Sequence, residues 1–376
     1  MSKTKINSLL ADNSVICLMA PTASGKTALA YELYDTGRFE LISVDSALVY
    51  KDMNIGTAKP SQQELQQYPH HLVDIIDPTQ QYSVANFVDD VQCLVQQIHE
   101  RGKLPLLVGG TMMYYMALFQ GLSNIPETDP VIRQKVEERV QTDGIEALYG
   151  YLAQIDSNIA QRLQPTDTQR ITRAVEVYMQ TGKPLSVWQN SPKKALADNP
   201  KQQWHGLAVL PDRAWLHKRI AQRLEIMWQQ GLVEEVISLL HKYPLLQDKP
   251  SMRCVGYRQV IDYLYKINHP AVLQFTKIGE DKRSILPDKI SIYSTISIDT
   301  TFLAPNCNSK QKDLACQDMK NQALYATRQL AKRQYTWLRK LNKLDCFSGL
   351  VEQKQKNNIR ILNSLQQVQV LMDNSN

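Results

Sequence analysis

The chain reads Ala20-Pro21-Thr22-Ala23-Ser24-Gly25-Lys26-Thr27 where an apolar run, VICLMA (15–20), ends and a segment of helical pattern, ALAYEL, begins. This is close to the Walker A pattern G-x-x-x-x-G-K-[ST], whose loop joins a strand to a helix and binds phosphate. Gly25 allows the turn that points backbone N–H groups at phosphate oxygens, and Lys26 places a cation on the outer phosphate. The Thr27 hydroxyl can bind Mg²⁺, and the helix N-terminus adds partial positive charge. We therefore expect a phosphate site in which Pro21 to Thr27 take part.

Further apolar runs of the same kind predict the sheet around this loop. They are ELISVD (40–45), LPLLVGG (104–110) and LAVL (207–210), each bounded by Gly, Pro, Ser or Asp. Short runs of this composition, separated by helical patterns, are typical of buried parallel strands. The predicted fold class is α/β, a P-loop NTPase-like parallel sheet flanked by helices. Residues 1–120 form its first part, and the chain returns to it in 201–345.

The remaining regions differ in pattern. Residues 121–200 open on NIPETDPVI, show helical periodicity with many charges and close on NSPKKALADNPKQQ, which indicates a mostly helical insertion domain. Helices are expected around 212–242 and 252–266. Isoleucines mostly two apart between 290 and 298 predict a short exposed strand or hairpin within 267–320. Residues 346–376 are a polar tail rich in Gln and Asn, in which some disorder is expected.

Composition excludes several classes of protein. Of the 376 residues, 43% are hydrophobic and 21% charged, enough for a sizeable core, so disorder along the whole chain is excluded. No run approaches the roughly 20 apolar residues of a membrane helix. The start lacks a signal-peptide cleavage site. The six cysteines include no CxxC pair, which favours free thiols in a reducing cytoplasm over a zinc site. We expect a cytoplasmic protein without membrane contact.

The positive charge is concentrated near the C-terminus. Residues 319–344 contain seven Lys or Arg and no acidic residue, whereas the whole chain has a net charge of +6, so the remainder carries −1. At 100° per residue, Arg328, Lys332, Arg339 and Lys343 fall on one helix face, opposite Leu330, Trp337, Leu338, Leu341 and Leu344. A solvated charged face usually mixes signs, so this one predicts contact with a polyanion such as RNA.

Polar residues follow two more of the predicted strands. ELISVD ends in Asp45, and LPLLVGG is followed by Thr111. Ligands of parallel sheets bind at the carboxyl ends of the strands, so both residues should lie at the same rim as Lys26. A carboxylate beside a bound diphosphate can hold Mg²⁺ or accept a proton. The alternatives are a helix N-cap for Asp45 and a tight turn for the Gly-Gly-Thr segment. The pair His70-His71 could bind a metal, but a structural role is favoured because adjacent strand residues face opposite ways.

Six segments together resemble the bacterial tRNA dimethylallyltransferases, also called tRNA isopentenyltransferases. They cover about 14–266 and 322–340 in collinear order and are PTASGKTALA, LISVDSALVYKDMNIGTAKP, LLVGGTMMYY, DTQRITRAVEV, SMRCVGYRQ and ATRQLAKRQYTWLR. The resemblance implies transfer of a dimethylallyl group from dimethylallyl diphosphate to N6 of adenine 37, beside the anticodon, in tRNAs that read codons beginning with U. It also implies Mg²⁺ as cofactor. A P-loop suits this reaction because diphosphate is the leaving group.

The resemblance also implies roles for individual residues. Asp45 matches the general base, Thr111 the residue that steadies the transition state, and Arg219 or Arg223 a diphosphate contact, with Lys26 holding the leaving group. The anticodon stem-loop of tRNA must be gripped and its target base unstacked. The residues implied to contact tRNA are Asp45, Ser46, Ala47, Leu48, Thr111, Arg133, Gln169, Arg170, Ile171, Thr172, Arg173, Arg253, Cys254, Val255, Gly256, Tyr257, Arg258, Lys332, Arg333, Gln334, Tyr335, Thr336, Trp337, Leu338 and Arg339. A monomer is expected.

The chain departs from the family pattern in two places. Ala20 stands where Gly is usual, which requires a negative φ at this residue. Residues 267–320 form an extra stretch between two of the matching segments, and residues after about 345 have no counterpart.

Three other functions remain open on the sequence. An adenylate isopentenyltransferase acting on free nucleotides needs the loop and Asp45 but no RNA-gripping insertion. A small-molecule kinase needs a P-loop with Asp45 orienting a hydroxyl acceptor. A non-catalytic RNA-binding NTP sensor would keep RNA binding after loss of Asp45.

Overall fold

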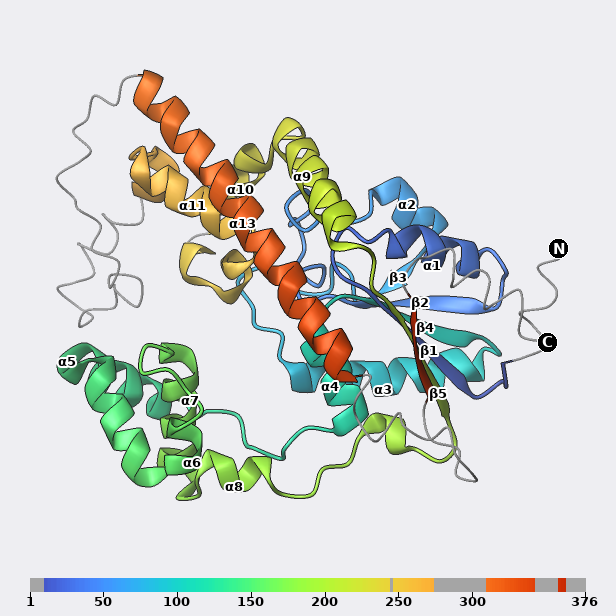
Figure 1. The fold of residues 1–376 in the computed structure, drawn as a ribbon, viewed down its shortest axis with the longest axis horizontal. Helices are drawn as coiled ribbons and strands as arrows, with labels where there is room; N and C mark the ends of the chain where they lie inside the picture. The colour runs from blue at the N-terminus through green and yellow to red at the C-terminus, as the bar shows by residue number, and fades with distance from the viewer. Residues whose placement is uncertain (1–9, 244–245, 274–308, 342–357, 363–376) are drawn as a thin grey trace. The chain divides into compact units, whose positions relative to one another are not determined.

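The computed structural model describes residues 10–243, 246–273, 309–341 and 358–362 (Figure 1). By their internal contacts the residues form two compact units. The first consists of Met1–Met116 and Asn199–Asn376, and the second of Ala117–Asp198. The first unit contains the sheet, and the elements described in the second are all helices. No helix within the described ranges is long and apolar enough to cross a membrane.

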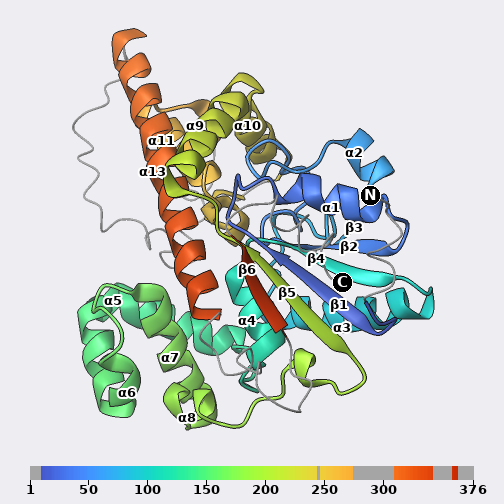
Figure 2. The same ribbon diagram turned by 45° about the vertical axis from the view of Figure 1, so that its right-hand side comes forward.

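The sheet has six described strands, all paired in parallel. Their order is β3-β2-β4-β1-β5-β6, which Figure 2 shows edge to edge. The strands are β1 (Ser14–Met19), β2 (Phe39–Val44), β3 (His70–His71), β4 (Leu104–Gly109), β5 (Gln203–Val209) and β6 (Asn358–Leu362). The α/β parallel sheet and its four expected strands are thereby confirmed. The loop of residues 20–25 follows the central strand β1 at its carboxyl end.

Helices on both faces of the sheet bury its central strands. All six residues of β1 and of β4 are buried, as expected for strands covered on two sides. Helices α1 (Lys26–Tyr34) and α3 (Val84–Glu100) lie on opposite faces (Figure 1). Helix α1 contributes Leu29, Ala30 and Leu33 to the core, and α3 contributes Phe87, Val91, Val95 and Ile98. Each fully buried large apolar side chain stabilises the fold by roughly 1.5–3 kcal/mol.

The two edge strands were not expected from the sequence. Strand β3 is only two residues long and pairs with Leu41 and Ile42, so it is too short to show alternation. Strand β6 lies inside 346–376, which we expected to be a polar tail. Its sequence, NIRIL, does alternate polar and apolar residues at its start, and it pairs with β5 along its whole length. This part of the tail belongs to the sheet.

Helices that follow β5 form a layer beside the sheet. They are α9 (Arg213–Gln229), α10 (Leu232–Lys242), α11 (Tyr257–Lys266) and α13 (Ser309–Leu341), with 3-10 turns at Leu246–Asp248 and Pro250–Arg253. Gly231 and Gly256, which precede α10 and α11, have positive φ values of 92° and 97°. Only glycine adopts such a backbone conformation at low cost, so these two residues allow the chain to turn before each helix begins. The hairpin expected near 290–298 lies outside the described residues, and residues 309–320 of the extra stretch belong to α13.

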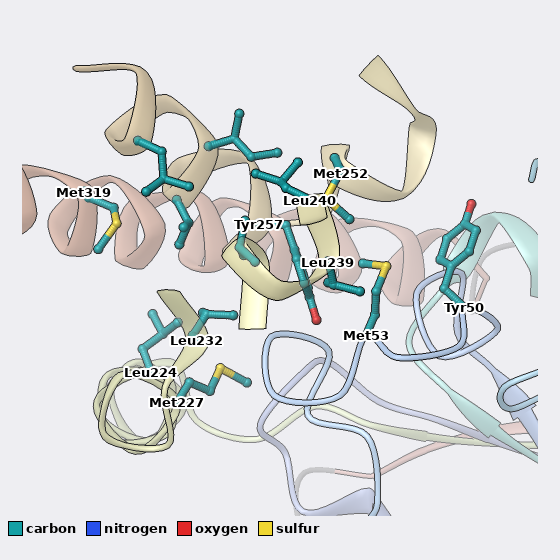
Figure 3. Close-up of a cluster of buried hydrophobic side chains, with 14 of the residues drawn as sticks. Tyr50, Met53, Leu224, Met227, Leu232, Leu239, Leu240, Met252, Tyr257 and Met319 are labelled. Atoms are coloured by element: carbon teal, nitrogen blue, oxygen red, sulfur yellow. The ribbon is translucent and has the colours of Figure 1, made fainter. Parts of the chain in front are cut away.

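Tyr257 joins this helical layer to the loop after β2. Figure 3 shows its ring inside the apolar cluster, with Leu239 and Met53 beside it. Its hydroxyl donates to Glu235 Oε1 at 2.6 Å. The Glu235 carboxylate also accepts the backbone N–H groups of residues 54, 55 and 56 at 3.0, 2.7 and 3.2 Å. Four hydrogen bonds to one carboxylate, each stronger than a neutral pair, hold this loop against α10.

The second unit, Ala117–Asp198, is built on the packed helices α5 (Pro130–Ile155, kinked at Gly144) and α7 (Thr168–Thr181) with shorter helices beside them. The shorter helices are α6 (Ser157–Ala160) and α8 (Leu185–Gln189), with a 3-10 turn at Leu196–Asp198. Helix α4 (Met112–Gln120) leads into it. Its core gathers Val136, Leu148, Leu152, Ile171 and Val175.

Gly109 gives a test of how closely the strands approach. A Cβ at this position would lie 2.1 Å from the Val44 carbonyl oxygen, so Gly109→Ala must push β4 away from β2. We expect urea-induced unfolding to show a loss of at least about 2 kcal/mol in the free energy of unfolding. The matched control is Gly150→Ala in α5, where a Cβ meets nothing within 4 Å. It should stabilise its helix by about 0.5–1 kcal/mol. A Gly109→Ala protein as stable as the parent would contradict the close approach.

Candidate functional site

The loop after β1, which we call the phosphate loop after its expected ligand, contains two residues with positive φ. Gly25 has a φ of 90° and stands as the N-cap of α1, and Ala23 has a φ of 61°. Ala20 is buried and has no positive φ, so the alanine that replaces the usual glycine fits without strain. Its N–H donates to the Gly109 carbonyl at 3.3 Å, which extends the β1–β4 pairing by one bond. The strained position of this loop is therefore Ala23.

Two hydroxyl groups of the loop are placed for a ligand. The Ser24 hydroxyl is buried and has no hydrogen-bond partner in the part of the chain that the structure describes. An unpaired buried hydroxyl costs roughly 1–3 kcal/mol, which a hydrogen bond from this hydroxyl to a phosphate oxygen would recover. Thr27 lies exposed in the first turn of α1. Both features fit a loop that closes around an anion.

Three charged side chains meet beside the loop. The pKa of Lys26 is lowered to about 8, chiefly because burial disfavours its charged form. The negative charge of Asp45 opposes this shift, and the positive charge of Arg223 adds to it. Burial likewise lowers the pKa of Arg223, with Asp45 opposing and Arg219 adding. The two cations from α1 and α9 and the carboxylate after β2 thus share one electrostatic environment, as the sequence predicted for Lys26 and Asp45.

Asp45 and Thr111 lie together where β2 and β4 end. The Thr111 N–H donates to the Val44 carbonyl at 3.2 Å, and the Thr111 hydroxyl oxygen accepts the Ser46 N–H at 3.1 Å. Oδ1 of Asp45 accepts the Ala47 N–H at 2.9 Å, which closes a turn rather than capping a helix. No hydrogen bond from the described residues reaches its Oδ2. One carboxylate oxygen is therefore fixed while the other can accept a proton.

The segment 253–258 also borders this site. Burial, with a smaller contribution from the negative charge of Asp45, raises the pKa of the Cys254 thiol to about 12. Arg253 and Arg258 are exposed, Cys254 and Val255 are half-buried, and Gly256 and Tyr257 are buried. In this segment only the side chains of Arg253 and Arg258 are exposed enough for an RNA molecule to reach them fully. Tyr257 instead holds the loop after β2 through its hydrogen bond to Glu235.

Two side chains from the helical layer hold the phosphate loop in place. Gln334 of α13 accepts the Thr22 N–H on Oε1 at 3.0 Å and donates from Nε2 to the Gly110 carbonyl at 2.8 Å. Arg219 of α9 donates from Nε to the Ala23 carbonyl at 3.1 Å. Arg219 was expected at the diphosphate, and it supports the loop through its backbone. The sequence placed Gln334 among RNA contacts, and its buried amide lies against the loop instead.

Helix α13 presents a basic surface, but its faces differ from those expected. Lys332, Arg333, Thr336, Trp337 and Arg339 are exposed, whereas Gln334, Tyr335 and Leu338 are buried. The buried line runs through Ala331 and Leu338, so Trp337 lies at its border and is 38% exposed. Arg328 lies at the other border and is half-buried. The expectation that Trp337 docks and Arg328 is free was therefore wrong, while Lys332 and Arg339 are exposed as predicted. Lys343 and Leu344 lie outside the described residues.

The second unit carries the other expected RNA contacts. On α7, Gln169 and Arg170 are exposed, Thr172 and Arg173 are half-buried and Ile171 is buried in the core. Arg170 pairs with Asp167, and Arg173 donates to Thr128 and to the Pro126 carbonyl. Arg133 lies 4.0 Å from Glu176, which Arg173 approaches within 3.8 Å. Acidic neighbours of their own unit orient all three arginines, and the side chains of Arg170 and Arg133 remain 72% and 44% exposed.

His70 and His71 have the structural role that was favoured. Nδ1 of His70 lies 2.6 Å from the Tyr68 carbonyl oxygen, and Nε2 of His71 lies 3.0 Å from Glu40 Oε2. Burial lowers the pKa of His70. Within the described ranges no three His, Cys, Asp or Glu side chains are grouped to bind a metal.

The donors at the rim nevertheless fit a divalent ion that arrives with a substrate. Mg²⁺ takes oxygen ligands and is usually bound by one or two protein groups together with substrate phosphates and water. The exposed Thr27 hydroxyl is an oxygen donor of this kind. A dedicated cage of protein carboxylates is not needed for such a site.

Solved structures of other proteins share this architecture. A tRNA isopentenylpyrophosphate transferase from Bacillus halodurans superposes with a TM-score of 0.54 at 26% identity, covering 96% of this chain and 95% of that one. A eukaryotic dimethylallyltransferase acting on tRNA superposes with a TM-score of 0.65, covering 96% and 77% of the two chains, and at 21% identity it supports the fold alone.

Sequence comparison gives closer relatives. The tRNA dimethylallyltransferase of Psychrobacter sp. (strain PRwf-1) is 66% identical over 332 residues, which are 88% of this chain and 86% of the relative. That of Acinetobacter baumannii (strain ATCC 17978) is 46% identical over 347 residues, 91% and 95% of the two chains. A family model described as IPP transferase matches residues 48–341. With most of its length matched in both ways, the chain belongs to the IPP transferase family.

Proposed function

We propose that this protein transfers a dimethylallyl group from dimethylallyl diphosphate to N6 of adenine 37 in tRNAs that read codons beginning with U. The observation that carries the proposal is the shared rim of the sheet. There Asp45, with one oxygen unoccupied, lies in the same electrostatic environment as Lys26 and Arg223 beside a phosphate loop. The names of the relatives, at up to 66% identity, support the same reaction.

The site residues divide the reaction between base and leaving group. The N6 lone pair is delocalised into the adenine ring, so the amine attacks better as its proton passes to Oδ2 of Asp45. The N6–carbon bond forms as the carbon–oxygen bond to diphosphate breaks, and the electron pair of that bond leaves with the diphosphate. Lys26, Arg223, the Ser24 hydroxyl and loop N–H groups stabilise this departing charge. Thr111, held beside Asp45 by the Ser46 N–H, steadies the transition state.

Mg²⁺ is the cofactor we propose for this site. Thr27 would hold it together with phosphate oxygens of the substrate, which leaves Oδ2 of Asp45 free to accept the proton. When bound, it supplies additional positive charge to the departing diphosphate.

The RNA substrate is supported by exposed cations in each unit. The exposed basic residues among the proposed contacts are Lys332, Arg333 and Arg339 on α13, Arg253 before α11, Arg258 in its first turn, Arg133 on α5 and Arg170 on α7. A transferase for free nucleotides would need none of these surfaces. A kinase would share the loop, but the relatives' names do not favour it.

We propose a monomer in the cytoplasm, where tRNA is available.

Nucleoside mass analysis tests the reaction directly. The protein is incubated with Mg²⁺, dimethylallyl diphosphate and an unmodified tRNA that reads U-initial codons, and the digested nucleosides are weighed. We expect dimethylallyl-adenosine from that tRNA and none from a tRNA whose adenine 37 is replaced. Product on free adenosine monophosphate with none on tRNA would favour the free-nucleotide reading.

Asp45→Ala separates catalysis from binding. The variant removes the base but no exposed cation, so tRNA affinity should stay within about twofold while turnover falls by at least about 100-fold. Asp45→Asn, which keeps the size of the side chain, should fall similarly. Substantial turnover in either variant would show that another group accepts the proton.

The pH dependence of diphosphate binding reports on Lys26. Because its pKa is about 8 in the free protein, the ammonium form is present below that pH and lost above it. Affinity for dimethylallyl diphosphate should therefore weaken as the pH rises through about 8, at most about tenfold per pH unit. Lys26→Arg keeps a cation at every pH and should flatten the profile between about pH 7 and 9.5. An equally steep profile in the arginine variant would assign the titration to another group.

Salt dependence tests the basic surface of α13. Replacing Lys332, Arg333 and Arg339 together by alanine should weaken tRNA binding and reduce the slope of log K against log salt by about 2, since each phosphate contact to single-stranded RNA contributes about 0.7. The control replaces Lys310 and Lys312, exposed on the same helix but outside the proposed contacts. An unchanged slope in the triple variant would remove α13 from the RNA surface.

A further inference from the structure

The strands β1 and β4 separate at their carboxyl ends, beside the proposed reaction site. Their last backbone hydrogen bond joins the Ala20 N–H to the Gly109 carbonyl at 3.3 Å. Beyond it, the chain after β1 becomes the phosphate loop, and the chain after β4 leads to Thr111. The Thr22 N–H and the Gly110 carbonyl are the next groups along, and both are bonded to the side-chain amide of Gln334.

The orientation of this amide is fixed by its partners. A backbone N–H can only donate, and a backbone carbonyl can only accept, so Oε1 must face Thr22 and Nε2 must face Gly110. At 3.0 and 2.8 Å both hydrogen bonds have ordinary length. Gln334 is 8% exposed, and its neighbours Ala331, Tyr335 and Leu338 on α13 are buried as well. The amide therefore bridges the two chains at the place where a further backbone hydrogen bond between β1 and β4 would lie.

Gly110 is shaped to accept this side chain. A Cβ at Gly110 would lie 2.5 Å from Nε2 of Gln334 and 3.1 Å from the Ala20 carbonyl oxygen. The glycine thus gives room to the glutamine amide, and the two residues form one structural unit.

We propose that Gln334 is a positioning residue for the transfer step. Its amide fixes the spacing between the phosphate loop, which holds the leaving diphosphate, and the Gly109–Thr111 turn, which lies on the side of the adenine amine. This rests on the proposed function and assigns Gln334 a role different from RNA contact. In-line transfer needs the diphosphate and the adenine amine at a set separation, and an error of about 1 Å can cost about 100-fold in rate. Loss of the amide should therefore lower kcat more than it changes substrate affinity.

Gln334→Met tests this role because it keeps the length of the side chain and removes both hydrogen bonds. We expect kcat to fall about 10- to 100-fold. The dissociation constant for tRNA should stay within about twofold and the KM for dimethylallyl diphosphate within about fivefold. Gln329→Met, at an exposed glutamine of the same helix, is the matched control and should behave as wild type. A selective loss of tRNA affinity, or an unchanged kcat, would overturn the proposal. An inactive wild-type protein would instead contradict the proposed function.

Gln334→Glu gives a readout that a general loss of packing would not produce. Its carboxylate can still accept the Thr22 N–H, but it faces the Gly110 carbonyl with an oxygen that cannot donate. When protonated, the carboxyl group donates as the amide does. The ratio of variant to wild-type kcat should therefore rise as the pH is lowered from about 8 to about 6. A ratio independent of pH would contradict the need for a donor to Gly110.

A double-mutant cycle with Gly110→Ala completes the test even if one variant is less stable. Because the added methyl group would lie 2.5 Å from Nε2 of Gln334, Gly110→Ala should lower kcat strongly in wild type and less in the Gln334→Ala background, where only the 3.1 Å approach to the Ala20 carbonyl oxygen remains. Additive effects of the two substitutions would show that they act separately and would overturn the proposal.

Discussion

The site depends on the close approach of β4 to β2 at Gly109, where no side chain fits against the Val44 carbonyl. This approach brings the Thr111 N–H to Val44 and the Thr111 hydroxyl to the Ser46 N–H. Asp45 lies between Val44 and Ser46 in the chain, so the sheet backbone sets the positions of the proposed base and of the Thr111 hydroxyl. A constellation held by strand ends loses little conformational freedom when its substrates bind, which is what precise transfer chemistry requires.

The charges at the rim are arranged unfavourably for the free protein and favourably for a diphosphate. Burial lowers the pKa of both Lys26 and Arg223, repulsion from Arg223 adds to the shift of Lys26 and repulsion from Arg219 to that of Arg223, and Asp45 is the carboxylate that opposes both shifts. A ligand with several negative charges removes the repulsion and also pairs with the Ser24 hydroxyl, which otherwise lacks a partner in the described chain. In the proposed reaction the negative charge on diphosphate increases as it departs, so these groups would stabilise the transition state more than the bound substrate.

Sequence periodicity and the residues at strand ends predicted the parallel sheet and the residues at its rim. The long-range side-chain contacts were not predicted. The strands around Lys26, Asp45 and Thr111 could be predicted because buried parallel strands have a strong apolar signal. Strands β3 and β6 are too short to give one. Glu235 and the amide of Gln334 act on segments about 180 and 310 residues away, as their bonds to Ile55 and Thr22 show. No local pattern marks such partners. The faces of α13 were misassigned for a related reason: which residues pack depends on what the helix meets.

Helix α13 serves two purposes because successive residues on a helix point about 100° apart. Arg333 faces solvent, and Gln334, the next residue, faces the phosphate loop. A glutamine on a flexible loop would form this amide bridge less favourably, since fixing an exposed glutamine side chain costs up to about 2 kcal/mol of rotamer entropy. On α13 the packing of Leu338 and the hydrogen bond from Tyr335 to the Pro211 carbonyl already anchor the helix beside the site. One rigid element thus carries cations for a polyanion on one side and completes the β1–β4 spacing on the other.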